Sequence, residues 1–287
     1  MNSILLCTDG SSFAEKSYNY SIWLAHRLSA EVSVLFVTDI RSQKVTSTGN
    51  LSGSIGLGAS QELLKKLVDL EHEKAKINHK RAKLILTKAR QTLSQAGVEE
   101  VKLIHKTGFL VDCFHEFEDD ADLIVLGKRG EAAEFASGHL GANLERIVRS
   151  SSKPCFVTSR EYQDIERVLI TYDGSKTGKQ MLQFVMTSPI FKGLDLHVIT
   201  IAQNPDSSLG IRRIEESRNQ LQEVGLTPVC SLQTGEPEDV ISKYVDDYNI
   251  QLLVMGAYGH SRIRHLVIGS TTAQMLRASN IPVLLYR

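Results

Sequence analysis

The feature that most constrains the fold is a glycine-rich segment that joins an apolar run to a helical stretch and occurs twice in the chain. In the second copy, residues 256–272, the order is Gly-x2-Gly-x9-Gly-Ser-Thr-Thr. Glycines let backbone N–H groups approach an anion, and the start of a helix offers unpaired N–H groups and a favourable dipole. The hydroxyls of Ser270 and Thr271 could add hydrogen bonds to phosphate oxygens. The segment predicts phosphate binding, with simple turns and an N-cap as the alternative.

The first copy, residues 127–143, is an altered version that reads Gly-x2-Gly-x10-Gly-Ala-Asn. A second landmark repeats with it, because the run Asp9-Gly10-Ser11 matches Asp173-Gly174-Ser175. The chain is therefore an internal duplication. We expect two domains, residues 1–160 and 161–287, with an insertion in the first.

Short apolar runs alternate with amphipathic stretches in each half, which predicts βαβ units on an open parallel sheet, an α/β Rossmann-like fold. The expected strands are residues 3–8, 31–38, 101–106, 122–126 and 154–158, and 167–171, 195–201, 227–233, 252–255 and 282–286. Helical spacing is clear over 13–28 and 61–96, and Gly97 and Gly225 are expected just past helix ends. The last strand of each half starts with Pro, which suits an edge strand that needs a partner or a cover.

Composition excludes several classes of protein. The 33 basic and 33 acidic side chains cancel, so nothing favours nucleic acid or an anionic membrane as a partner. No stretch approaches the roughly 20 apolar residues of a membrane span, and the run Ile4–Cys7 is too short for a signal peptide, so we expect a cytoplasmic protein. The cysteines lack C-x-x-C spacing and are expected to be buried, reduced thiols. They are Cys7, Cys113, Cys155 and Cys230.

The order of motifs resembles the universal stress protein family in its tandem two-domain form. That order is a strand, Asp-Gly-Ser and a helix, then Gly-x2-Gly-x9-Gly-Ser/Thr before the last helix, then a strand begun by Pro. The glycine motif marks the nucleotide-binding branch of that family. The resemblance implies an adenine nucleotide α-hydrolase-like fold that binds ATP or ADP, with or without Mg²⁺. It also implies that strands 154–158 and 282–286 pair with one another, which makes the chain an internal pseudo-dimer and leaves a further homodimer open.

The resemblance also assigns positions to the nucleotide. In the second half the adenine contacts would be Thr171, Tyr172, Asp173 and Ile201, and the ribose and phosphate contacts Gly256, Gly259, Gly269, Ser270 and Thr271. In the first half the matching positions are Cys7, Thr8, Asp9, Val37, Gly127, Gly130, Gly141, Ala142 and Asn143. The longer loop of the first half and the alanine in place of Ser or Thr predict weaker binding there.

Several of these side chains have a simpler interpretation. Asp9 and Asp173 could serve only in Asx-turns or N-caps. Basic residues near the glycine loops could contact phosphate or remain solvated on the surface; they are Lys128, Arg129, His260, Arg262, Arg264 and His265. We expect no metal site. The inserted stretch Ser42–Ser60 is predicted to be a loop, either a lid or a surface excursion, and the helix after it could reach beyond its domain and form an interaction surface.

The sequence favours a binding module of the stress response whose nucleotide occupancy modulates contacts with a protein partner. A slow ATPase or phosphotransferase is the rival, although the loop lacks the Gly-Lys-Ser/Thr of a P-loop and no catalytic residue is expected. A scaffold that binds no nucleotide is the third alternative.

Overall fold

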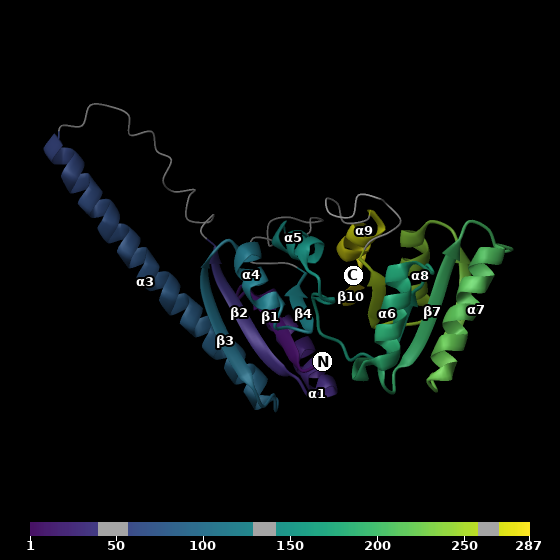
Figure 1. Ribbon diagram of the computed structural model, residues 1–287. Helices are drawn as coiled ribbons and strands as arrows, with labels where there is room; N and C mark the ends of the chain where they lie inside the picture. The colour runs from purple at the N-terminus through teal and green to yellow at the C-terminus, as the bar shows by residue number, and fades with distance from the viewer. Residues whose placement is uncertain (40–56, 129–141, 258–269) are drawn as a thin grey trace.

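The computed structural model describes residues 1–39, 57–128, 142–257 and 270–287, which form one mixed sheet with helices on both faces (Figure 1). The strands are β1 (Ser3–Thr8), β2 (Glu31–Asp39), β3 (Val101–Gly108), β4 (Leu123–Gly127), β5 (Cys155–Thr158), β6 (Arg167–Thr171), β7 (Asp195–Ala202), β8 (Val229–Thr234), β9 (Leu252–Gly256) and β10 (Val283–Tyr286). The helices are α1 (Ser12–Leu28), α3 (Leu57–Gln95), α4 (Leu110–Glu118), α5 (Ala142–Ser150), α6 (Lys176–Thr187), the 3-10 helix η2 (Pro189–Phe191), α7 (Ser208–Glu223), α8 (Pro237–Asp247) and α9 (Ser270–Ala278). The predicted α/β fold is confirmed.

The strand order is β3-β2-β1-β4-β5-β10-β9-β6-β7-β8. Among the described residues, neighbouring strands are parallel except at the centre, where β10 runs antiparallel to β5 with Leu284 opposite Phe156. This pairing of the two terminal strands confirms the internal pseudo-dimer. Pro154 and Pro282 precede these strands, and their carbonyl oxygens accept hydrogen bonds from Ile124 N (3.0 Å) and Leu253 N (3.1 Å).

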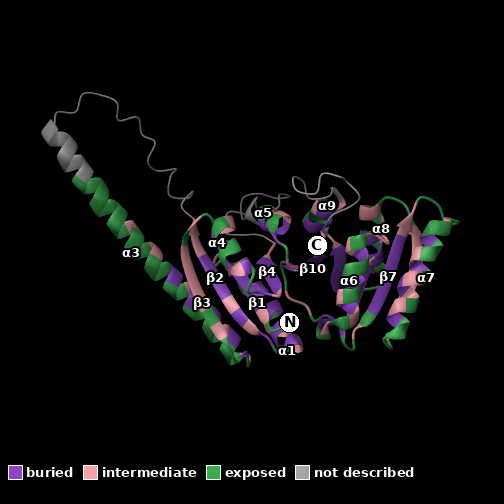
Figure 2. Ribbon diagram, in the orientation of Figure 1, coloured by how far each residue is buried: buried purple, intermediate pink, exposed green. Residues whose placement is uncertain are grey.

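The strands between the two outermost ones, β3 and β8, bury side chains on both faces of the sheet, as parallel sheets covered by helices do. In β1, Ile4 and Leu6 belong to a core that includes residues of α1 and α3, whereas Leu5 belongs to a second core that includes residues of α4 and α5. Figure 2 shows the buried strands between exposed helix faces. The apolar runs of the sequence are therefore strands of the central sheet, and their side chains are buried between it and the helices on both of its faces.

Glycine lies just past the ends of two helices, where it was expected. Gly97 (φ +86°) and Gly225 (φ +79°) lie just beyond α3 and α7, in the left-handed region that glycine tolerates. The residue after each glycine donates back into the last turn: Val98 N to Leu93 O at 3.1 Å and Leu226 N to Leu221 O at 3.0 Å. Both glycine predictions are confirmed.

Helix α3 differs from its prediction at its start. It begins at Leu57, so residues 57–60, which were assigned to the inserted loop, are helical. Extending a helix adds one hydrogen bond for each residue fixed, so a long helix extends readily beyond its packed segment. The rest of the predicted loop lies outside the described residues. Helix α3 projects well past the sheet at the left of Figure 1.

Contacts across the junction hold the two halves together. The hydroxyl of Tyr20 in α1 accepts a hydrogen bond from Gln163 N at 3.3 Å, and the ring centroid of Tyr20 lies 4.9 Å from that of Tyr162. The guanidinium of Arg27 donates to the carbonyl oxygens of Ile190 (3.0 Å) and Lys192 (2.8 Å) around η2. These bonds fix the orientation of both halves of the sheet.

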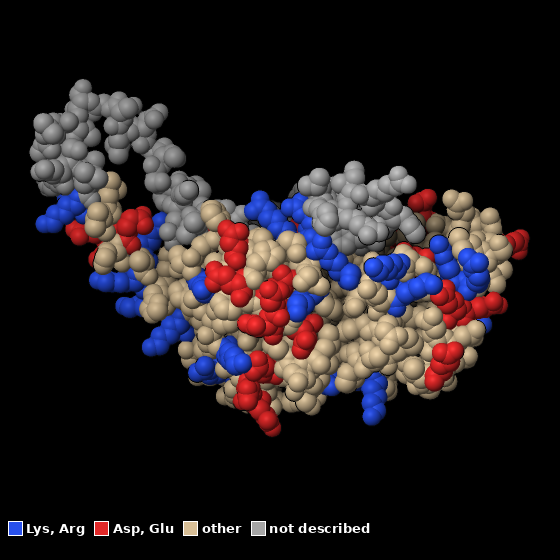
Figure 3. Space-filling view, in the orientation of Figure 1, with Lys and Arg blue, Asp and Glu red and all other residues tan. Residues whose placement is uncertain are grey.

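The cysteines largely follow expectation. All four are free thiols, and Cys7, Cys113 and Cys155 are buried. Cys230 is only half-buried, which corrects that prediction: it lies on β8, an edge strand with a neighbour on one side only. In the part of the chain that the structure describes, no helix is both long and apolar enough to cross a membrane. Figure 3 shows acidic and basic side chains interspersed on the visible face, with no large field of one sign.

Candidate functional site

The second half has a topological switch point at the carboxyl end of β6. Strand β6 lies between β9 and β7, and the chain leaves it on one side for β7 and returns on the other as β9. Ligands of open α/β sheets bind at such points. The structure brings three of the predicted residues to this edge, since Thr171, Ile201 and Gly256 lie at or next to the ends of β6, β7 and β9.

The turn after β6 is built from Asp173, Gly174 and Ser175. Asp173 Oδ1 accepts from Ser175 N at 2.9 Å, and Gly174 has φ +68°. Ser175 is the N-cap of α6, and its Oγ accepts from Gly178 N at 3.0 Å. The carboxylate therefore has the predicted Asx-turn role, which leaves it at the strand edge where a base or ribose would lie.

Tyr172 faces the interior instead of the strand edge. Its side chain is 2% exposed and belongs to the core that includes α6 and α7. Burial, with Glu216 nearby, raises the pKa of its hydroxyl to about 12. Its backbone is also engaged, because its N–H donates to Ile199 O (2.9 Å) and its carbonyl accepts from Thr200 Oγ1 (2.8 Å). The Tyr172 side chain thus packs beneath the turn, and its predicted contact with an adenine stays a prediction.

Thr272 ties the start of α9 to the end of β9. Its buried hydroxyl lies 3.4 Å from Gly256 O and 3.3 Å from Ala257 O, to which it donates. The tether fixes the first turn of α9, which also carries half-exposed Thr271, beside the switch point. Thr272 belongs to the glycine-rich segment that the sequence predicts to bind phosphate, but the sequence did not predict this contact. Gly259, Gly269 and the side chain of Ser270 lie outside the described residues, so their predicted phosphate contacts stay predictions.

The first half repeats this arrangement around β1, which lies between β2 and β4. Asp9 Oδ1 accepts from Ser11 N at 3.0 Å, the same Asx-turn as in the second half. Thr8 Oγ1 bonds with Tyr18 OH at 2.9 Å and accepts from Gly10 N at 3.2 Å, so its hydroxyl is already used.

Of the remaining predicted positions of the first half, the structure describes the surroundings of three: Cys7, Val37 and Gly127. Cys7 is buried, and burial raises the pKa of its thiol to about 12. Val37 and Gly127 are half-buried at the ends of β2 and β4. Gly130 and Gly141 lie outside the described residues. Ala142 and Asn143 open α5, but their side chains are not described.

Two residues that the sequence did not single out cover the Asp-Gly-Ser turns. Ile85 of α3 lies over Gly10, and Arg213 of α7 lies over Gly174: a Cβ built on each glycine would lie 2.4 Å from Ile85 Cδ1 and 2.9 Å from Arg213 Nε. The two helices occupy matching places in the halves, so the second site gains a guanidinium where the first has an aliphatic side chain. No local pattern marks either residue.

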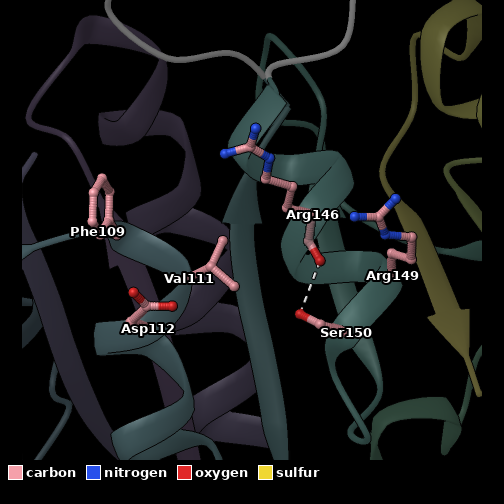
Figure 4. Close-up of a pocket in the computed structure, with 6 residues that line it drawn as sticks. All are labelled: Phe109, Val111, Asp112, Arg146, Arg149 and Ser150. Atoms are coloured by element: carbon pink, nitrogen blue, oxygen red, sulfur yellow. Dashed lines mark hydrogen bonds between the residues drawn. The ribbon is translucent and has the colours of Figure 1, made fainter. Parts of the chain in front are cut away.

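A cavity of about 390 Å³ lies between α4 and α5 in the first half (Figure 4). Residues from the start of α4 line one side and residues of α5 the other; they are Phe109, Val111, Asp112, Arg146, Arg149 and Ser150. The turn at Asp9 leads instead into α1, which packs on the opposite face of the sheet. None of the residues that line this cavity is among the predicted nucleotide contacts.

The described histidines make local contacts. His105 Nε2 bonds with Thr38 Oγ1 at 3.0 Å, and His115 Nδ1 lies 2.8 Å from Glu118 Oε2. Within the described ranges, no group of three or more His, Cys, Asp or Glu side chains is placed to hold a metal ion. His139, His260 and His265 fall outside those ranges, as do Arg129, Arg262 and Arg264. Lys128 Nζ donates to Ser279 O, so it bridges the two halves.

Comparison with known proteins gives a consistent result. The family model described as "Universal stress protein family" matches residues 1–159 and 164–287. Universal stress protein Slr1230 of Synechocystis sp. is 54% identical over 287 residues, which cover 100% of both chains. Among solved structures, a universal stress protein from Archaeoglobus fulgidus DSM 4304 aligns with a TM-score of 0.68 and 22% identity, covering 99% of this chain and 95% of that one. This last likeness shows the same tandem fold.

Proposed function

The chain belongs to the universal stress protein family, and on that premise we propose that it is an adenine-nucleotide-binding module whose occupancy regulates contact with a protein partner. The observation that carries the proposal is the convergence, in the second half, of three strand ends and the start of α9, held by the Thr272 tether. Residues 1–160 and 161–287 are the two proposed domains, and ATP or ADP, with or without Mg²⁺, is the proposed ligand.

Gly256 supports this assignment because the fold itself does not need a glycine there. Among the described residues, a Cβ built on Gly256 would meet Thr177 Cγ2, at an ordinary 3.7 Å, and the φ of Gly256 is not in the left-handed region. By contrast, Gly178 is needed internally, since a Cβ on it would lie 2.6 Å from Asp173 Oδ1. No described residue crowds this position of Gly256, which suits a ligand that approaches the backbone. The dipole and N–H groups of α9 would then favour the phosphates.

A protein partner that distinguishes the occupied site from the empty one would have to detect a change in the residues beside the nucleotide. Arg213 lies beside the turn at Asp173, where its charge could interact with an anionic ligand.

We propose the cytoplasm as the compartment, which the four free thiols support because a reducing environment keeps cysteines unpaired.

The experiment is a two-step test on the full chain. Mass spectrometry of the supernatant after denaturation identifies any co-purified nucleotide, and calorimetry then compares ATP and ADP binding by the unmodified protein and by Gly256→Val. We expect the variant to keep its unfolding transition and to lose most of its affinity in the second half. Unchanged affinity would show that the site is misplaced. Phosphate release in the same samples separates a slow ATPase from a binding module.

A further inference from the structure

Among the described side chains of helix α3, the buried ones all belong to its C-terminal part. Its buried residues are Ala82, Leu86, Ala89 and Leu93. In the described stretch before Ala82, residues 65–81, every side chain is exposed or half-buried. That stretch is about 25 Å long at 1.5 Å per residue, and an isolated helix of this size is marginal in water. Figures 1 and 2 show it projecting from the body with an exposed surface.

An apolar stripe runs along the outer side of the projecting helix. Leu70, Ile77 and Leu84 are spaced by seven residues and are 61%, 65% and 72% exposed. Residues spaced by seven share one face of a helix, as residues at one heptad position of a coiled coil do. Leu84 points away from the buried face, since its neighbour in the sequence, Ile85, is the one that packs over Gly10. The stripe therefore faces solvent while the other side of the same helix is bound to the sheet.

A row of four exposed charges flanks the stripe. The row consists of Asp69, Glu73, Lys76 and Lys80, spaced by four, three and four residues, so that all lie on one flank of the helix. The two acidic residues come first and the two basic residues last. Figure 3 shows both signs of charge on the projecting helix.

We propose that the projecting part of α3 pairs antiparallel with the same helix of a second copy of this chain. A two-fold axis between residues 74 and 75 would place Asp69 opposite Lys80 of the second copy and Glu73 opposite its Lys76. Because the axis is two-fold, each of these two ion pairs occurs twice, which makes four ion pairs between the charge rows of the two copies. It also sets Leu70 beside Ile77 of the second copy, so the stripes cover one another. A parallel two-fold pair would instead set this row against the other flank of the second helix, so the row would not meet its own complement.

The charge row allows a sharp test on the full chain without nucleotide. Analytical ultracentrifugation should find a dimer of the unmodified protein at about 100 µM that weakens as salt rises. Changing both acids (Asp69→Lys with Glu73→Lys) or both lysines (Lys76→Glu with Lys80→Glu) gives a flank of one sign. Each double variant should weaken self-association by about tenfold or more. Mixing the two variants should give a heterodimer, and combining all four changes should restore the dimer.

A matched control keeps the net charge change but moves it elsewhere. Glu215→Lys with Glu223→Lys reverses two exposed acids on α7 and should leave the dimer intact, with circular dichroism confirming that every variant folds. The proposal is overturned if the unmodified protein is a monomer at this concentration. It is also overturned if the flank variants dimerise as well as the control does, or if the fourfold variant fails to recover.

Discussion

The side chain of Ile85 lies over Gly10 so closely that a Cβ added to Gly10 would be 2.4 Å from Ile85 Cδ1 and 2.6 Å from Cγ1. In the second half the matching glycine, Gly174, lies under the flexible side chain of Arg213. A branched aliphatic group from a packed helix has little room to move, whereas an arginine can swing into solvent. The two turns share a sequence but differ in what covers them.

Replacing Gly10 with alanine should destabilise the protein more than the same change at Gly174. Both residues have positive φ, +75° and +68°, which costs roughly 1–2 kcal/mol for a residue with a Cβ. Overlap with Ile85 should add about 1–3 kcal/mol at Gly10 only. Urea unfolding measures the difference. Gly193→Ala is the control, because Gly193 has φ +73° and no described residue lies within 4 Å of its Cβ position. Equal losses at Gly10 and Gly193 would contradict the packing argument.

The two halves should bind nucleotide unequally. Ala142 lacks a hydroxyl that could donate to a phosphate oxygen, and a hydrogen bond to a charged group is worth about 1.5–3 kcal/mol, or ten- to a hundredfold in affinity. Calorimetric titration should resolve one tight and one weak site, with Ala142→Ser strengthening only the weak one. Ser270→Ala should weaken only the tight one. Two equal sites in the unmodified protein would refute this expectation.

Thr272→Val should weaken nucleotide binding and lower the free energy of unfolding by about 0.5–1.5 kcal/mol, because it removes the hydroxyl that holds α9 to Gly256 and Ala257. Thr158→Val is the matched control. Its buried Oγ1 has no hydrogen-bond partner among the residues that the structure describes, so that change should be neutral or stabilising. Thermal unfolding and calorimetry test both variants. A Thr272→Val protein with full affinity would show that the tether does not position α9.

Glu118 should make stability depend on pH below neutrality. Burial alone would raise the pKa of this carboxyl, but hydrogen bonds from Ser151 Oγ (2.6 Å), His115 and Ser152 N outweigh burial and lower the pKa from 4.5. A lowered folded-state pKa gives stability that is present above the unfolded value and is lost as the pH falls through the folded one. Unfolding free energy should therefore fall from about pH 5 to pH 3, and Glu118→Gln should reduce that slope. An unchanged slope in the variant would assign the effect to other groups.

A protein reduced to residues 162–287 should dimerise through β10. Removing β5 leaves the paired row Val283–Leu285 as an open sheet edge, and such edges pair with another chain. Light scattering at micromolar concentration should give twice the chain mass. A monomer under these conditions would mean that the β5–β10 contact is too weak to form without the covalent link.

The strands were predictable because a parallel strand buried on both faces appears as a continuous apolar run between polar turns. The bounds of β1 and β6 agree with expectation at both ends. The covering residues were not predictable, since Ile85 lies 75 positions from Gly10 and no local pattern encodes which helix side chain meets which turn. Cys230 was misjudged for a similar reason, because its exposure depends on β8 being the last strand of the sheet. The phosphate contacts of Gly259 and Gly269 remain predictions from the sequence.

The antiparallel contact between β5 and β10 forms within one chain, so it does not depend on the protein concentration. Two separate chains would form this contact only above their dissociation constant, whereas here the effective concentration is set by a short linker and is on the order of millimolar. The pairing therefore persists at any protein level in a cell. Because each half always has the other as its neighbour, the two were free to diverge, and every molecule carries one altered and one intact glycine loop in a fixed ratio.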